Sequence, residues 1–188
     1  MEKQLAVDEH TTLSLPTISN AIEIFSLVNQ YRNDLREFLP WVDETHHVDD
    51  TREYIKFCLS QYDNGSALVY LLYYQNKIAG TLSFNTLDKS NDIAKIGYWL
   101  ASCYQGQGLM TKACAKMIEY GFNGLHLNRI EIHCAINNIK SQNIPIRLNF
   151  KKEGELKQGI KLANNQYVDG VIYGLVKEDF NLKLTSPH

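Results

Sequence analysis

A glycine-containing turn between an apolar run and a helical stripe is the feature that most constrains this chain. The run at 96–100 (IGYWL) has the character of a strand, and the turn at 104–111 (YQGQGLMT) follows it closely. An apolar stripe at helical spacing comes next, through Met110, Cys114 and Met117. The first turn of a helix has unpaired N–H groups, and glycine lets a ligand approach the backbone. The junction therefore predicts an anion site suited to a diphosphate, with a plain tight connection as the alternative.

Two common nucleotide-binding motifs do not fit this turn. A P-loop needs Gly-Lys-Ser/Thr after a four-residue gap, and the turn does not supply it. The dinucleotide fingerprint Gly-x-Gly-x-x-Gly would need a glycine where the chain has Thr111. No carboxylate lies between Lys95 and Lys116 to oppose an anion.

Composition indicates one ordinary globular domain over residues 1–188. Apolar residues make up 44% of the chain, the net charge is -2 and no basic run exceeds two residues, so we expect no nucleic-acid partner. The start of the chain lacks the apolar core of a signal peptide, and no stretch has the length of a membrane span, so we expect a cytoplasmic protein. The four cysteines are dispersed, which predicts buried free thiols and no metal site.

The pattern of apolar residues predicts a mixed α+β sheet flanked by helices. A first strand at 11–15 precedes a helix with an apolar face of Ile22, Phe25 and Val28. A polar loop at 41–50 precedes a helix capped by Asp49 or Asp50. The further elements expected are strands at 67–74, 78–87 and 93–100, a helix at 109–123, a strand at 129–135, a short helix at 139–148, and strands at 150–156 and 167–176.

These elements, with the turn 105–110 (QGQGLM) between a strand and a helix, resemble the GNAT superfamily of N-acetyltransferases. The acetyl-CoA motif of that family is Gln/Arg-x-x-Gly-x-Gly/Ala, and its last small residue is here Met110. We expect this larger side chain to lie beside the phosphates. Asn138 and Ser141, followed by the run 147–150 (RLNF), match a second family element. The resemblance covers roughly residues 10–180 and implies a mostly antiparallel sheet of about seven strands.

Several details look most like the ribosomal-protein N-acetyltransferases of the RimJ/RimL type, among them the runs 96–100 (IGYWL) and 83–85 (SFN). Many GNAT enzymes place a tyrosine seven residues after the asparagine to protonate the leaving thiolate. That position is Pro145 here, so the resemblance makes Ser141 the candidate acid. Asn149 replaces a usual glycine, and asparagine tolerates the left-handed conformation after a helix.

The resemblance also implies how acetyl-CoA is bound. Backbone N–H groups of residues 106–111 would hold the diphosphate, and the pantetheine arm would pair with the strand edge at Trp99–Ala101. This edge is available if the strands that contain Trp99 and Cys134 separate; Gly97 is either a bulge that starts the separation or a glycine required for packing. A backbone N–H near Trp99 or Leu100 is the expected donor to the reaction oxyanion, with Leu100 as the candidate residue. The cofactor-binding residues expected on this basis are Trp99, Leu100, Ala101, Gln105, Gly106, Gln107, Gly108, Leu109, Met110, Thr111, Asn138 and Ser141.

The general base and the acceptor are not fixed by the sequence. A structural role is favoured for His133, and Trp41 is expected to anchor the acceptor loop at 41–50. Adjacent histidines at 46 and 47 lack the spacing of metal ligands. The candidates for the base are Asp43, Glu44, Glu53, His133 and Asn85 with an ordered water.

We therefore expect an enzyme that transfers acetyl from acetyl-CoA to a primary amine by direct attack in a ternary complex. The favoured acceptor is the α-amine of a protein N-terminus, as in the ribosomal-protein enzymes. A polyamine or aminoglycoside is the alternative acceptor, and a non-catalytic acyl-CoA-binding module is the alternative class. A ping-pong route through Cys103 or Cys134 is the minor option. We expect a monomer or homodimer without a membrane partner.

Overall fold

A computed structural model of the chain describes the backbone of residues 1–185 and the side chains of residues 1–181. Eight strands form one sheet in the order β1-β2-β3-β4-β5-β6-β8-β7. The strands are β1 (Gln4–Ala6), β2 (Thr11–Ser14), β3 (Leu68–Tyr74), β4 (Lys77–Asp88), β5 (Ile93–Leu100), β6 (Arg129–Ala135), β7 (Lys151–Lys161) and β8 (Tyr167–Val176). The helices are α1 (Ala21–Gln30), α2 (Arg32–Leu35), α3 (Val48–Asn64), α4 (Leu109–Asn123), α5 (Ile139–Arg147) and α6 (Lys177–Thr185), with short 3-10 helices at Ile18–Asn20, Pro40–Asp43 and Ser102–Tyr104.

The expected α+β architecture is confirmed, with one strand more than about seven. The additional strand β1 has three residues, of which only Leu5 is buried, so it leaves almost no periodic signal. The neighbours β5 and β6 run parallel, whereas the other strand pairs are antiparallel. The parallel pair needs a long crossover, which α4 provides. None of the described helices has the length and apolarity that a transmembrane span needs.

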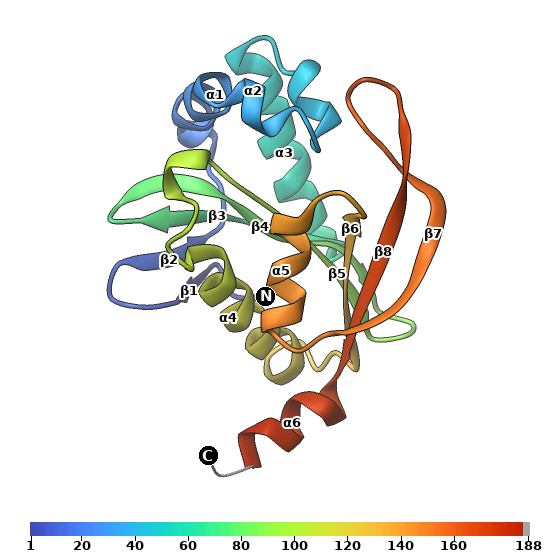
Figure 1. Cartoon of the computed structure of the whole chain (residues 1–188). Coiled ribbons are helices and arrows are strands. Elements are labelled where there is room, and N and C mark those ends of the chain that lie inside the picture. The colour runs from blue at the N-terminus through green and yellow to red at the C-terminus, as the bar shows by residue number, and fades with distance from the viewer. Residues whose placement is uncertain (186–188) are drawn as a thin grey trace.

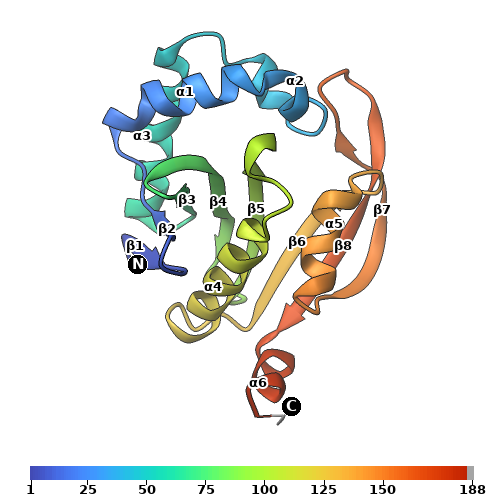
Figure 2. The same cartoon turned by 60° about the vertical axis from the view of Figure 1, so that its left-hand side comes forward.

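Helices cover the sheet from both sides (Figure 1). The larger apolar cluster lies between the sheet and α4, with Phe84 of β4 and Met117 of α4 fully buried in it. The second cluster joins α1 and α3 to the outer surface of β3 and β4. The half of the sheet formed by β6, β8 and β7 extends beyond α1 and α3, and the β7–β8 hairpin rises beside α2 (Figure 2).

Three local expectations in the N-terminal half need correction. On α1 the expected burial is confirmed for Val28, but Ile22 is 60% exposed and Phe25 is only half-buried, and the other buried residues are Ala21 and Ile24. The region at 41–50 is not a continuous loop, since Pro40–Asp43 is a 3-10 helix and α3 begins at Val48. The expected cap at Asp49 or Asp50 is wrong, because His47 is the N-cap of α3. Asp50 is the third residue of the helix, and its carboxylate accepts hydrogen bonds from the backbone N–H groups of His46 and His47.

Gly80 allows β4 to approach the end of β5. A Cβ atom at Gly80 would lie 2.1 Å from the carbonyl oxygen of Trp99 and 2.9 Å from the Cα of Leu100. Both atoms belong to the backbone, so neither can move without displacing the strand. The absence of a side chain at Gly80 therefore determines where the last residues of β5 lie.

We predict that Gly80→Ala lowers the free energy of unfolding by about 1–3 kcal/mol, because the new methyl group has no room. Urea denaturation followed by circular dichroism measures the change. Gly154→Ala is the matched control, since a Cβ there would meet no atom within 4 Å. Equal stabilities of the two variants would contradict this description of the β4–β5 contact.

Candidate active site

The glycine turn has a backbone conformation that favours glycine at two positions. Gly106 has a φ of +77° and Gly108 a φ of +73°, both in the left-handed region. A Cβ atom at either position would meet nothing within 4 Å. The glycines are therefore required by the path of the backbone, and the turn presents its main chain to open space.

The N-terminus of α4 can bind an anion. Gly108 is its N-cap residue, no side chain caps the helix, and its first turn has no acidic residue. The first intrahelical bond runs from the N–H of Lys112 to the carbonyl of Gly108, at 3.0 Å. The N–H groups of residues 109–111 precede this bond and have no helical acceptor. The donors and the helix dipole fit a diphosphate, as the sequence predicts.

The side chain of Met110 does not lie beside this anion site. Met110 is 5% exposed and belongs to the core cluster, and Leu109 is 4% exposed. The expectation that Met110 brings bulk to the phosphates is therefore wrong, because its position on α4 directs the side chain towards the sheet. Its backbone N–H remains in the first turn.

Strands β5 and β6 separate after four paired residues. Their parallel register joins Ile93–Ile96 to Arg129–Ile132, and it ends there. Beyond this point β5 continues along β4 as far as Leu100, while β6 continues along β8 as far as Ala135. The expected separation of these strands is confirmed, and Figure 2 shows them close at one end and apart at the other. We call the space between 97–100 and 133–135 the splay.

The expected bulge lies on the neighbouring strand and not at Gly97. The register between β4 and β5 shifts between Phe84 and Thr86, so Asn85 is the extra residue. A Cβ atom at Gly97 would lie 2.1 Å from the amide nitrogen of Asn85. Gly97 therefore leaves room for the side chain that the bulge directs across β5.

The backbone of β5 directs alternate residues to β4 and to the splay. The N–H of Ala101 donates to the carbonyl of Ala79 at 2.9 Å, and the carbonyl of Gly97 accepts from the Ser83 hydroxyl at 3.1 Å. These odd-numbered residues of β5, and Trp99 between them, face β4. Tyr98 and Leu100 therefore direct their backbone groups to the splay. The predicted strand edge at Trp99–Ala101 is therefore only partly available to a ligand. The backbone groups of Trp99 and Ala101 face β4, and those of Leu100 face the splay.

The N–H groups of Tyr98 and Leu100 are the donors that this alternation leaves towards the splay, and that of Leu100 lies at the end of β5. The carbonyl of Leu100 accepts from the side-chain amide of Gln105 at 3.1 Å. Gln105 also accepts from the ammonium group of Lys140 at 3.2 Å, which joins the turn to α5. The site therefore carries a backbone donor at one end and a lysine near the glycine turn at the other.

Ser141 lies on the opposite side of the splay, in the first turn of α5. The side chain of Asn138 accepts from the backbone N–H of Ser141 at 3.1 Å, so Asn138 is the N-cap residue of α5. The Ser141 hydroxyl donates to the Tyr98 hydroxyl at 3.1 Å and lies 3.2 Å from the sulfur of Cys134. The structure therefore brings Asn138 and Ser141 to the same space as the N–H of Leu100.

Tyr98 is a site residue that the sequence analysis did not identify. Its hydroxyl donates to the backbone carbonyl of Ser141 at 2.9 Å. In a regular helix this carbonyl would accept from the residue four positions later, but that residue is Pro145, which has no N–H. Burial raises the pKa of the Tyr98 hydroxyl, which keeps it protonated as a donor. Pro145 is the sequence signal that could have revealed this contact, because a proline inside a helix leaves a carbonyl that needs a hydrogen-bond donor from outside the helix.

The loop at 41–50 is anchored by Val42, which is fully buried, and not by Trp41. Trp41 is 38% exposed, and its ring centroid lies 6.1 Å from that of Trp99. The carboxylate of Asp43 pairs with Arg36 at 3.0 Å. Among the described residues there is no group of three or more histidines, cysteines or carboxylates that could hold a metal.

We predict that Tyr98→Phe lowers the free energy of unfolding by about 1–3 kcal/mol, because the carbonyl of Ser141 loses its donor in a part-buried position. Chemical denaturation measures the change. Tyr167→Phe removes the same hydroxyl from a side chain that is 59% exposed and is expected to have little effect. If both variants lower the free energy of unfolding by the same small amount, Tyr98 does not have the structural role assigned to it.

Comparison with known proteins agrees with this geometry. The model of the Acetyltransferase (GNAT) domain family matches residues 10–151. YdaF of Bacillus subtilis (strain 168) is 34% identical over 175 residues, which cover 93% of this chain and 95% of that protein. The ribosomal-protein-serine acetyltransferase of Escherichia coli (strain K12) is 27% identical, with 94% of this chain and 98% of that protein covered.

Solved structures have the same fold. The microcin C7 self-immunity acetyltransferase MccE, in complex with acetyl-CoA and AMP, is 33% identical with a TM-score of 0.89, and the match covers 94% of this chain and 97% of that one. RimL, the ribosomal L7/L12 α-N-protein acetyltransferase, in complex with coenzyme A, is 28% identical with a TM-score of 0.90, covering 94% and 99%. This chain therefore belongs to the GNAT acetyltransferase family and is an N-acetyltransferase with acetyl-CoA as its cosubstrate.

Proposed function

We propose that this enzyme acetylates the α-amine of a protein N-terminus, with a ribosomal protein in the cytoplasm as the favoured acceptor. The observation that carries this proposal is the convergence of the Leu100 N–H, Ser141 and the uncapped start of α4 on one splay. The names of the relatives support the acceptor class, since the Escherichia coli relative is a ribosomal-protein-serine acetyltransferase. We further infer that residues 1–188 form a single acetyltransferase domain.

The donor would bind along the splay from the glycine turn inwards. N–H groups of residues 106–111 would hold the diphosphate, and the exposed glycines support a close approach of its oxygens. The pantetheine arm would then pair with the backbone of Tyr98 and Leu100, as an added strand pairs with a sheet edge. This course brings the thioester between Leu100 and Ser141.

Acetyl transfer would proceed by direct attack of the amine on the thioester carbonyl. The N–H of Leu100 is the donor that stabilises the developing oxyanion, and one such donor contributes roughly 2.7–4 kcal/mol in other acyl-transfer sites. The hydroxyl of Ser141 would donate to the departing sulfur. Burial raises the pKa of the Cys134 thiol, which disfavours the thiolate that a ping-pong route would need.

A small-molecule amine is the alternative acceptor, and one feature of the cleft favours it. Trp41 is partly exposed against Trp99, which offers an aromatic surface that a planar group can stack on. The solved MccE structure holds AMP together with acetyl-CoA. A nucleotide-linked amine therefore belongs in any panel of acceptors, with polyamines and aminoglycosides.

Release of the coenzyme A thiol from acetyl-CoA tests the proposal. Synthetic decapeptides with N-terminal serine or alanine are compared with the same peptides blocked at the α-amine, with spermidine, an aminoglycoside and an aminoacyl nucleotide analogue. We expect turnover with free peptides and none with blocked ones. Turnover with small amines alone would reject the protein acceptor, and acetyl-CoA binding without turnover on the whole panel would favour a non-catalytic module.

A carboxylate in the first turn of α4 should change stability and binding in opposite directions. We predict that Thr111→Glu raises the free energy of unfolding by about 0.3–1 kcal/mol through the helix dipole. The same charge would oppose the diphosphate and weaken acetyl-CoA binding about tenfold or more, which is ~1.4 kcal/mol. Calorimetry and denaturation measure the two effects. Thr111→Gln is the uncharged control, and an unchanged affinity for Thr111→Glu would exclude this diphosphate site.

Loss of the Ser141 hydroxyl should affect turnover more than binding. We predict that Ser141→Ala lowers kcat by about 10²-fold, the lower end of the range for a proton donor, because a thiolate leaves readily. The affinity for acetyl-CoA should stay close to that of the wild type. Cys134→Ala removes the neighbouring thiol and should keep most of the turnover. The opposite pattern, with Cys134→Ala inactive and Ser141→Ala active, would support a route through the cysteine.

A further inference from the structure

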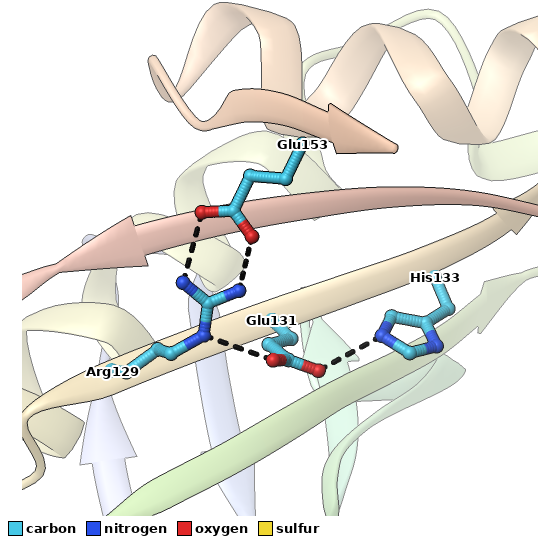
Figure 3. Close-up of polar contacts among 4 residues, drawn as sticks. All are labelled: Arg129, Glu131, His133 and Glu153. Atoms are coloured by element: carbon cyan, nitrogen blue, oxygen red, sulfur yellow. Dashed lines mark hydrogen bonds and ion pairs between the residues drawn. The ribbon is translucent and has the colours of Figure 1, made fainter. Parts of the chain in front are cut away.

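A chain of four charged or polar side chains joins β6 to β7 (Figure 3). The Nε2 atom of His133 lies 2.9 Å from one carboxylate oxygen of Glu131. The other oxygen of Glu131 accepts from Nε of Arg129 at 2.9 Å. The two terminal nitrogens of Arg129 donate to the two oxygens of Glu153 on β7. Both oxygens of Glu131 are therefore engaged, which fixes the carboxylate against His133.

His133 lies at the start of the splay. Ile132 is the last residue of β6 that pairs with β5, opposite Ile96, so His133 and Gly97 are the first residues of the separating strands. Ile96 and Ile132 are both buried on the side of α4. Because side chains alternate along a strand, His133 and the missing side chain of Gly97 point to the opposite surface. Cys134, the next residue of β6, is buried on the side of α4.

This opposite surface is the side from which an acceptor can reach the thioester. The side of α4 and α5 is filled by the core and, in the proposed function, by the coenzyme. Helices α1 and α3 contact β3 and β4, and Figure 2 shows both helices at the other end of the sheet from β6. The side chain of His133 is 29% exposed, whereas that of Glu131 is 16% exposed. The imidazole of His133 is thus accessible at the start of the splay, whereas the carboxylate of Glu131 is more buried.

The partner of Nε2 determines which nitrogen of His133 can take a proton. A carboxylate only accepts hydrogen bonds, so Nε2 must carry the hydrogen that faces Glu131. In the neutral ring Nδ1 then has the free lone pair. Nδ1 has no hydrogen-bond partner among the side chains that the structure describes, and Figure 3 shows it directed away from Glu131.

The cluster places one guanidinium and two carboxylates beside the imidazole of His133. Arg129 contributes one positive charge, and Glu131 and Glu153 contribute two negative charges, so a neutral His133 leaves the cluster at about -1. Burial opposes the charge of Glu131, but the hydrogen bonds from Arg129 and His133 hold the pKa of its carboxyl below the usual value. Glu131 therefore stays ionised beside the imidazole.

We propose that His133 is the general base that deprotonates the acceptor amine, with Glu131 as its positioning residue. The proposal rests on the proposed function, because it places the thioester in the splay. Nδ1 removes one proton as the amine nitrogen forms its bond to the acetyl carbon. The C–S bond then breaks, and the thiolate takes a proton by way of Ser141. The proton on His133 passes to solvent.

Three of the other candidates for the base have different partners. Asp43 pairs with Arg36, and Glu53 pairs with Lys56 at 2.7 Å on the exposed surface of α3. The side-chain oxygen of Asn85 accepts from Ser83 at 2.6 Å, and an amide has no proton-accepting function near neutral pH. An imidazole with its carboxylate is the arrangement that orients a base in other acyl-transfer enzymes.

Two substitutions at His133 test the proposal with a decapeptide that has an N-terminal serine or alanine. His133→Gln keeps an amide donor for Glu131 but cannot take a proton, and we expect kcat to fall by about 10²-fold or more. His133→Ala leaves a space, and added imidazole should restore part of the lost rate. His126→Asn is the control, since His126 is an exposed histidine with a φ of +58°, which asparagine tolerates.

The readouts separate this proposal from a structural role and from failure of the proposed function. Acetyl-CoA affinity and Tm should match the wild type in both His133 variants. Two results overturn the role of His133 alone. The first is a wild-type kcat for His133→Gln. The second is a lower kcat that imidazole does not restore and that comes with weaker acetyl-CoA binding or a lower Tm. Wild-type enzyme that binds acetyl-CoA but acetylates neither peptide overturns the proposed function and this inference together.

Discussion

The separation of β5 from β6 after Ile96 is the constraint on which the site depends. As long as the strands pair, their backbone groups satisfy each other, and no donor is free for a ligand. After the last pair, β5 continues along β4 alone, and the N–H of Leu100 faces open space. Gly80 keeps the end of β5 close to β4, while the bulge at Asn85 shifts the register beside it. A sheet with eight strands thus gains an internal edge without losing its continuity.

The splay divides the protein into two chemically different sides. On the side of α4 and α5, the uncapped helix start, the cap of α5 and the pair of Tyr98 and Ser141 face one another. On the other side the surface is charged and carries His133 with Glu131. A thioester bound between the strands would meet an acid on one side and a base on the other. In this arrangement one residue takes the proton from the amine and another supplies a proton to the thiolate.

Pro145 has a double consequence for the first of these sides. It occupies the position at which many GNAT enzymes have a tyrosine, and it also removes the N–H that the carbonyl of Ser141 would receive. Tyr98 supplies the missing donor from β5, across the splay. The helix that carries Ser141 is therefore tied to the strand that carries Leu100. A different aromatic residue thus takes part in the site, as a donor to the backbone.

Local sequence signals predicted the elements that carry the proposed coenzyme site. Helix α4 has the predicted bounds, because its apolar stripe and its glycine N-cap are both encoded within fifteen residues. Features that depend on contacts between distant segments were not predicted. The bulge at Asn85 and the contact of Tyr98 with Ser141, 43 positions apart, depend on how strands are placed side by side. The pair of Glu131 and His133 has a visible signal, since residues two apart on a strand share one surface.

An amide-resolved NMR titration with acetyl-CoA tests the central claim most directly. If the coenzyme lies along the splay, the largest shifts should occur at the N–H groups of residues 106–111 and of Leu100, on two segments that the same ligand contacts. The N–H of Ala101, bonded to Ala79, should shift less. Saturable binding that shifts amides elsewhere and leaves both segments unchanged would contradict the site described.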